Sequence, residues 1–159
     1  MLTIRRAQRE EAACLTEIAF AAKRHWGYPE SWLEAWRTDL TITPEFIARH
    51  EVFVAIEHDQ PVGFYALVTS EGITELDHLW VLPEWMGKGI GRRLLTQAID
   101  RARALNIATV EIVSDPNAEA FYLKAGARKI GEVPSAVEGQ QRCLPRLAID
   151  ILNTGDTLK

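Results

Sequence analysis

Three glycines at alternate positions in the middle of the chain could bind a phosphate. Gly87, Gly89 and Gly91 follow an apolar, strand-like segment that ends near Pro83. Glycine lets the backbone turn tightly and approach a ligand with no Cβ in the way. The helix expected to begin at Gly89 adds unpaired N–H groups and a partial positive charge in its first turn. Strand, glycine turn and helix start together predict a cradle for a phosphate or pyrophosphate.

Two better-known phosphate-binding motifs do not fit this loop. A P-loop needs Gly-Lys followed by Ser or Thr, whereas Lys88 is followed by Gly89, so no hydroxyl is available for magnesium. A dinucleotide-binding fingerprint needs G-x-G-x-x-G after an early strand, whereas the spacing here is G-x-G-x-G in mid-chain. A glycine-rich turn without a ligand is the alternative, because short glycine motifs recur by chance.

The loop resembles the pyrophosphate loop of the GNAT acetyltransferases, usually written R/Q-x-x-G-x-G/A. Met86, Gly89 and Gly91 stand at its marked positions, and Met86 departs from the usual Arg or Gln. A second stretch, 117–127, reads Asn-Ala-Glu-Ala-Phe-Tyr-Leu-Lys-Ala-Gly-Ala and is similar to the other signature of that family. Its last residue, Ala127, replaces a common aromatic. The order of elements agrees with the family over 2–152, nearly the whole chain.

Membership of this family implies an α/β (α+β) fold of the GNAT type. Its sheet is mixed and mostly antiparallel, is flanked by helices, and splays between two central strands, here 73–82 and 109–113. The acyl-carrying arm lies in that split. We expect one acyl-CoA N-acyltransferase domain over 1–152, followed by a frayed tail over 153–159.

The resemblance also implies acetyl-CoA, and hence coenzyme A, as co-substrate, with no metal. The amides of the loop suit the pyrophosphate, and the end of the central strand would pair with the pantetheine arm. The cofactor-binding residues expected on this basis are Leu79, Trp80, Val81, Met86, Gly87, Lys88, Gly89, Ile90, Gly91, Arg92, Asn117, Tyr122 and Lys124. For Asn117, capping of a helix after Asp115-Pro116 is an alternative compatible with this role.

Acyl transfer from a thioester to an amine needs a base, donors for the oxyanion and an acid for the leaving thiolate. Tyr122 matches the family's tyrosine and is the candidate acid, as a phenol with a pKa near 10; its alternative is a core aromatic. Glu75 and Asp77 alternate on the central strand and share one face, so they are the candidate bases. Glu75 is preferred, because an acceptor amine could enter near it. His78 follows as a weaker candidate, and ordered water is the alternative to all of them.

The acceptor site is expected near the first two helices and the last hairpin. Trp26, Tyr28 and Trp32 are the candidate substrate-binding residues. Trp32 and Trp36 share a helical face and could hold a cation or an apolar ring, or could equally be core. Arg142 and Arg146 could meet an acidic group of the substrate.

The resulting hypothesis is an acetyltransferase that moves an acetyl group from acetyl-CoA to an amine of a small molecule or peptide, by direct transfer in a ternary complex. The alternatives are a non-catalytic acetyl-CoA-binding regulatory module, O-acylation of a hydroxyl compound, and nucleotide binding. The identity of the acceptor is beyond what the sequence predicts.

The composition of the chain limits its expected partners and its expected location in the cell. The chain has 159 residues and a net charge of -4, so it has no basic field for nucleic acid. Cys14 and Cys143 lack metal-ligand spacing, and two reduced core thiols are expected rather than one disulfide. No apolar run is long enough to span a membrane, and the N-terminus does not read as a signal peptide. The expected location is the cytoplasm, with a homodimer left open.

These residues require a regular order of elements. Apolar periodicity and turn signals predict antiparallel hairpins on both sides of a central strand–helix–strand crossover. The expected helices cover 8–25, a second segment capped by Ser31 with Glu34 as its capping box, 44–49, 89–105 and 117–124. The expected strands cover 2–6, 52–57, 61–69, 73–82, 109–113, 127–133 and 142–152.

Overall fold

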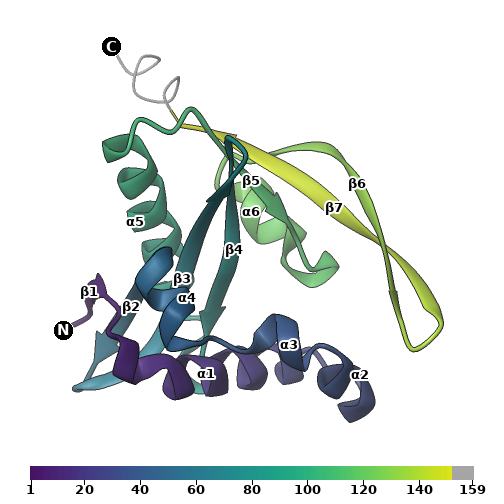
Figure 1. Ribbon diagram of the computed structural model, residues 1–159, viewed down its shortest axis with the longest axis horizontal. Helices are drawn as coiled ribbons and strands as arrows, with labels where there is room; N and C mark the ends of the chain where they lie inside the picture. Colours follow the sequence, from purple (N-terminus) through teal and green to yellow (C-terminus); the bar gives the residue numbers. More distant parts are fainter. Residues whose placement is uncertain (152–159) are drawn as a thin grey trace. The chain divides into compact units, whose positions relative to one another are not determined.

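The computed structural model (Figure 1) describes residues 1–151. These residues form two compact units. The first unit contains Met1–Leu67 and His78–Leu95. The second contains Val68–Asp77 and the described residues from Thr96 onward. The predicted tail 153–159, with Leu152, lies outside the described residues.

The first unit is built from helices and antiparallel strands. Its strands follow the order β1-β2-β3-β4, and β1 and β3 pair antiparallel with β2 on its two sides. The elements that lie in it wholly or in part are β1 (Thr3–Arg6), η1 (Arg9–Glu11), α1 (Ala12–His25), α2 (Glu30–Ala35), α3 (Arg37–Leu40), α4 (Pro44–Arg49), β2 (Glu51–Glu57), β3 (Gln60–Ser70), β4 (Ile73–Val81), η2 (Pro83–Trp85) and α5 (Ile90–Ala104).

Helix α1 buries the apolar stripe that its sequence predicts. Ala12, Leu15, Ile18, Ala19 and Ala22 are all buried. Most of this stripe belongs to one apolar core with side chains of β2 and β3. The spacing of three and four residues between these positions puts them on one side of the helix, which explains why the prediction succeeded.

The predicted hairpin of β2 and β3 is confirmed. His58 and Asp59 have φ angles of 51° and 62° at its tip. Two successive positive φ angles are typical of a type I′ turn, whose twist matches that of the flanking strands.

The second unit contains the ends of β3 and β4 that follow Leu67 and precede His78, together with the later elements. Its strand order is β3-β4-β5-β7-β6, with β5 parallel to β4 and antiparallel to β7. The later elements are β5 (Thr109–Val113), η3 (Pro116–Ala118), α6 (Glu119–Lys124), β6 (Arg128–Val137) and β7 (Gln140–Asp150). The parallel pairing comprises Thr74 with Val110 and Glu75 with Glu111. The predicted mixed, mostly antiparallel sheet is thus confirmed, with seven strands.

The last hairpin is longer than predicted. Strands β6 and β7 form a long twisted ribbon in Figure 1, closed by Glu138 and Gly139 with φ angles of 50° and 79°. The expected loop between 133 and 142 is therefore wrong. Strand β6 can include Pro134 because it is an edge strand, where the missing N–H of proline is not needed by a further strand.

Two smaller predictions about helices are also wrong. Pro29, not Ser31, precedes the first residue of α2, and Glu34 binds Arg37 instead of closing a capping box. The helix predicted to end at Leu105 ends one residue earlier, at Ala104. Leu105 is 41% exposed, whereas Leu95 within the helix is buried. By contrast, α4 begins as predicted, with the Thr43 hydroxyl accepting from the Phe46 N–H. None of the described helices is both long and apolar enough to cross a bilayer.

Candidate active site

The glycine loop lies between η2 and α5 in the first unit. Gly87 and Gly89 have φ angles of 78° and 82°, which only glycine adopts without strain. A Cβ built on either residue would meet no atom within 4 Å, so the space beside the loop is open. Backbone conformation, not crowding, therefore requires glycine at these two positions.

The first turn of α5 follows the loop directly. The Arg93 N–H donates to the Gly89 carbonyl at 3.1 Å, and Ile90 anchors the turn in the core at 5% exposure. In a helix the N–H groups of the first turn have no partner within the helix, and they carry its positive dipole end. Open glycines beside such a turn fit the pyrophosphate of coenzyme A.

Charged and apolar side chains border this loop. Lys88 is exposed, and its Nζ lies 5.7 Å from the centroid of the Trp85 ring. Arg92 is exposed in the first turn of α5, and Met86 is half-buried with an extended backbone. The two positive charges would attract an anion held by the loop, whereas the Met86 thioether cannot donate a hydrogen bond to it.

The end of β4 approaches β3 unusually closely. A Cβ on Gly63 of β3 would lie 2.8 Å from the Trp80 carbonyl oxygen and 3.1 Å from Leu94 Cδ1. Glycine is required here by crowding, because the nearest atom is backbone. The last residues of β4 are half-buried: Leu79, Trp80 and Val81. Partial exposure is what pairing of this strand end with a pantetheine arm would require.

Trp80 is oriented by its neighbour two residues back on β4. Its Nε1–H donates to Nδ1 of His78 at 2.9 Å. His78 is buried, at 7% exposure, and its ring contacts Phe46 and Phe64 at centroid distances of 5.7 Å. This engagement of Nδ1 disfavours His78 as a base and favours a role in holding Trp80.

Aromatic side chains gather where α1 gives way to α2. Tyr28 stacks on Trp32 at 5.7 Å and meets Trp36 edge-on at 5.0 Å. Trp36 also packs against the core. Trp26 stays apart, because its ring contacts His25 and is 40% exposed. The structure thus brings together two of the three predicted acceptor residues, with Trp36 as their neighbour.

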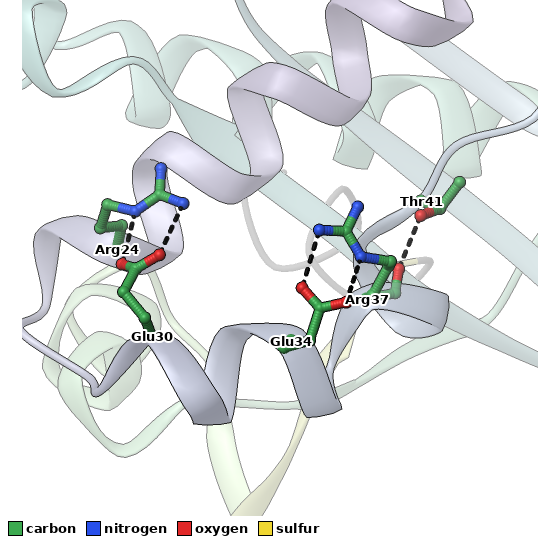
Figure 2. Close-up of polar contacts among 5 residues, drawn as sticks. All are labelled: Arg24, Glu30, Glu34, Arg37 and Thr41. Carbon is green, nitrogen blue, oxygen red and sulfur yellow. Dashed lines mark hydrogen bonds and ion pairs between the residues drawn. The ribbon is translucent and has the colours of Figure 1, made fainter.

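Two exposed ion pairs link α2 to the helices on either side of it (Figure 2). Arg24 of α1 forms two hydrogen bonds to Glu30, and Arg37 of α3 forms two to Glu34, at 2.8 to 3.2 Å. These hydrogen bonds lower the pKa of both carboxyl groups. Helix α2 is therefore tied to the helices before and after it.

The candidate bases lie in the second unit. Burial along β4 alternates, with Thr74 and Leu76 buried and Glu75 and Asp77 on the other face, as predicted. Asp77 is exposed, whereas the Glu75 carboxylate is half-buried and lies 3.5 Å from Nη1 of Arg146.

Arg146 also binds Glu111, at 2.9 Å. Glu75 and Glu111 are register partners on parallel strands, so their like charges would repel each other without a cation. Arg146, which the sequence suggested as a substrate contact, instead bridges the two carboxylates.

The second signature places two further candidates. The Asp115 side chain, not Asn117, caps η3, and it accepts from both the backbone N–H and Nδ2 of Asn117 at 2.8 and 2.9 Å. The alternative role of Asn117 as a helix cap is therefore wrong. Lys124 is exposed at the last residue of α6.

Tyr122 is the buried residue of α6, and its ring contacts Phe121 at 5.1 Å. Burial, and secondarily the charge of Asp115, raise the pKa of Tyr122 well above its usual value of 10. The expectation of an ordinary phenol is wrong, because loss of water penalises the phenolate. The hydroxyl stays protonated over the whole working range, as an acid must before it acts.

Both cysteines are free thiols, as expected, but not both are core. Cys143 is exposed, and Cys14 is half-buried, with its pKa raised first by burial and then by Glu17 and Glu11. Among residues 1–151, no group of three or more His, Cys, Asp or Glu side chains could hold a metal ion.

Sequence reasoning missed two residues of the first unit, Lys23, which lies against the aromatic side chains, and Gly63. In the second unit it missed Arg146 as a bridge. Their contacts join segments far apart in the chain or separated by a turn, so helical or strand spacing could not reveal them. An isolated glycine within the apolar strand β3 was the one available signal, since such a glycine often marks a close backbone approach.

Comparison with known proteins agrees with this geometry. Residues 14–127 match the model of the acetyltransferase (GNAT) family. The peptidyl-lysine N-acetyltransferase YjaB of Salmonella typhimurium is 31% identical over 134 residues, covering 82% of this chain and 86% of that protein. Its Escherichia coli counterpart is also 31% identical, with 82% and 85% coverage.

Solved structures share the fold at lower identity. The PaiA N-acetyltransferase of Thermoplasma acidophilum, in complex with coenzyme A, has a TM-score of 0.78 at 21% identity, covering 94% of this chain and 99% of that one. YncA of Salmonella typhimurium with acetyl-CoA, described as a putative acetyltransferase, has a TM-score of 0.71 at 22% identity, with 95% and 94% coverage.

Proposed function

We propose, from the premise that the chain belongs to the GNAT acetyltransferase family, that it acetylates the side-chain amine of lysine in a peptide. The chain is an acetyl-CoA-dependent N-acetyltransferase that uses an amine acceptor. The lysine acceptor is our proposal, and the two relatives named peptidyl-lysine N-acetyltransferases support it. The carboxylates of Glu75 and Asp77 on one face of β4 support it too, because they attract an ammonium.

The geometry of the glycine loop is the main support for binding of the acetyl donor, acetyl-CoA. We assign the pyrophosphate to the N–H groups over Gly87–Arg92, with Lys88 and Arg92 adding charge. Each charge-assisted hydrogen bond contributes about 1.5–3 kcal/mol, and a few of them offset the cost of immobilising the donor. The remaining expected contacts are Leu79, Trp80, Val81 and Met86 with the donor arm and loop, and Asn117, Tyr122 and Lys124 from the second signature.

Direct transfer in a ternary complex then needs three proton movements. Glu75, or failing it Asp77, accepts a proton from the acceptor ammonium, and the freed amine attacks the thioester carbonyl. A new C–N bond forms, the C–S bond breaks, and Tyr122 gives its proton to the departing sulfur. The attacking nitrogen loses its second proton, which restores the hydroxyl of Tyr122. N–H groups of β4 near Trp80 stabilise the oxyanion between these steps. Arg146 holds Glu75 in place, and Tyr28 and Trp32 bind the acceptor.

We propose further that residues 1–152 act as one acyltransferase domain, since the family model spans residues of both compact units. A cytoplasmic location fits the two free thiols, which persist in a reducing compartment.

Release of free thiol across a panel of amines tests the proposal. The panel contains a peptide with one internal lysine and a blocked N-terminus, the same peptide with that lysine replaced by norleucine, peptides with free N-termini, polyamines and aminoglycosides. We expect acetyl-CoA-dependent thiol release with the lysine peptide and none with its norleucine control. Turnover of the other amines alone would reject the lysine acceptor.

Thermal unfolding tests the donor site separately. Acetyl-CoA at about 100 times its Kd should stabilise the fold by about 2.7 kcal/mol. ATP and NAD serve as controls, and equal shifts with all three ligands would reject a site selective for acetyl-CoA.

A further inference from the structure

The ammonium of Lys23 lies among three aromatic rings of the first unit. Its Nζ is 4.3 Å from the ring centroid of Trp36, 5.1 Å from that of Tyr28 and 6.0 Å from that of Trp80. We call Tyr28, Trp36 and Trp80 the aromatic cage. A cation within about 6 Å of a ring centroid is attracted by the ring's negative face.

The cage differs from the other cation–ring contacts of the described residues. Arg6, Arg37 and Lys88 each face one ring, at 5.0 to 5.7 Å. Lys23 faces three, supplied by the connection after α1, by the end of α2 and by β4. Rings converging from three segments on one charged atom make a site for an ammonium group.

The walls of the cage are fixed independently of Lys23. Trp36 and Trp80 pack against the core, and the Trp80 indole is held by its hydrogen bond to His78. Tyr28 packs edge-on against Trp36, with ring centroids 5.0 Å apart, so a wall that is held in the core supports the third one. The rings can therefore keep their arrangement when the long lysine side chain leaves.

The lysine side chain itself defines the chemistry that the cage accepts. It is the same alkylammonium that the proposed acceptor would present, held against the residue at the centre of the segment Leu79–Val81. A ring face attracts the charged ammonium and not the neutral amine, so the cage holds an alkylammonium in its charged form until a base takes its proton.

We propose that the aromatic cage is a binding site for the alkylammonium group of the acceptor, and that Lys23 is its intramolecular occupant, which the acceptor must displace. The statement that the acceptor's ammonium displaces Lys23 rests on the proposed function. The statement that the cage binds a simple cation does not depend on it.

Titration with tetramethylammonium chloride, followed by the indole N–H signals of a ¹⁵N-labelled protein at constant ionic strength, tests the site. Lys23→Met removes the charge and keeps the length of the side chain. Arg24→Met is the matched control, because it removes the neighbouring cation of the same helix, which faces Glu30. We expect Lys23→Met to bind tetramethylammonium roughly tenfold more tightly than wild type, with shifts at Trp36 and Trp80, and Arg24→Met to stay within about twofold of wild type.

Equal affinities in wild type and Lys23→Met, or an equal gain in Arg24→Met, would overturn the proposal. If Lys23→Met fails to fold, the wild-type protein decides. Tetramethylammonium should then move the ring-shifted Hε signals of Lys23 toward their values in a free peptide, and unmoved signals would overturn it.

The lysine-peptide assay separates this inference from the proposed function. Tetramethylammonium binding without acetylation of the lysine peptide would retain the cage and reject the lysine acceptor. Acetylation with a KM unchanged in Lys23→Met would retain the acceptor and reject its competition with Lys23.

Discussion

The indole N–H of Trp80 donates to Nδ1 of His78 over 2.9 Å, between residues two apart on the same face of β4. The bond requires an unprotonated Nδ1, and it fixes the plane of an indole that also contacts Lys23. The sequence suggested separate roles for these residues, with His78 as a weaker candidate for the base and Trp80 as a residue that binds the acetyl donor. The hydrogen bond joins them into one unit.

Replacing His78 should disturb Trp80 more than the chemistry. We expect His78→Phe to lower stability by about 1 kcal/mol, since the indole donor loses its partner, and to reduce kcat by less than tenfold. Urea unfolding and steady-state kinetics measure both. His50→Phe is the control, since His50 also contacts Phe46. A kcat loss of 10² or more in a folded His78→Phe protein would restore His78 as a base.

Gly63 should be intolerant of a methyl group. In Gly63→Ala the new Cβ would meet the Trp80 carbonyl oxygen at 2.8 Å, so the end of β4 must shift. We expect a loss of about 1–3 kcal/mol in unfolding free energy, with weaker acetyl-CoA binding. Gly131→Ala is the matched control in a strand, because a Cβ there meets nothing within 4 Å. Equal stability of the two variants would contradict the close approach.

The two candidate bases should separate by mutation. Glu75 is held by Arg146, whereas Asp77 is exposed. We expect Glu75→Gln to reduce kcat by about 10² or more, and Asp77→Asn by less than tenfold. Rates measured at saturating acetyl-CoA over a pH series would check this. The reverse order would move the base to Asp77, and no effect of either would favour ordered water.

Met86 stands where the family usually has Arg or Gln, and the effect of this difference can be tested by restoring a hydrogen-bond donor. Met86→Arg adds charged hydrogen-bond donors beside the loop and should tighten coenzyme A binding by about 1 kcal/mol. Calorimetry provides the measurement. Met86→Leu, which has a similar volume and no donor, should leave the affinity unchanged. Weaker binding by a folded Met86→Arg protein would mean that the methionine packs against the donor or the core.

The raised pKa of Tyr122 predicts a specific pH dependence of stability. The folded state holds this proton more tightly than the unfolded state, so the contribution is complete below pH 10 and is lost as pH rises beyond it. Tyr122→Phe should remove this loss, whose slope is at most about 1.4 kcal/mol per pH unit for one proton. Unfolding free energies measured on both sides of pH 10 test it, with Tyr28→Phe as control. A wild-type slope that persists in Tyr122→Phe would assign it to another group.

Activity of Tyr122→Phe tests the second role of this residue. If the phenol protonates the departing thiolate, kcat should fall by about 10²–10⁴ with acetyl-CoA affinity close to wild type. A limb at high pH from this phenol is not expected in the measurable range, because its pKa is raised. An unchanged kcat, with chemistry shown to limit turnover, would exclude Tyr122 as the acid.

The sequence alone determined the local features of this protein. Positive φ at Gly87 and Gly89, the start of α5 after them and the alternation of Glu75 with buried neighbours follow from backbone sterics and from the periods of helix and strand. The two signatures were enough to identify the family and the donor. These signals need only residues close in the chain, so they can be read without a structure.

The tertiary structure alone decided which distant side chains meet. Lys23 enters the aromatic cage because packing brings the connection after α1, the end of α2 and β4 together, and Arg146 bridges two carboxylates because β7 pairs beside β5. Burial of Tyr122 likewise depends on what surrounds α6, and it changes the pKa that the residue type alone suggests. Desolvation and contacts between segments are properties of the packed chain, and no local pattern encodes them.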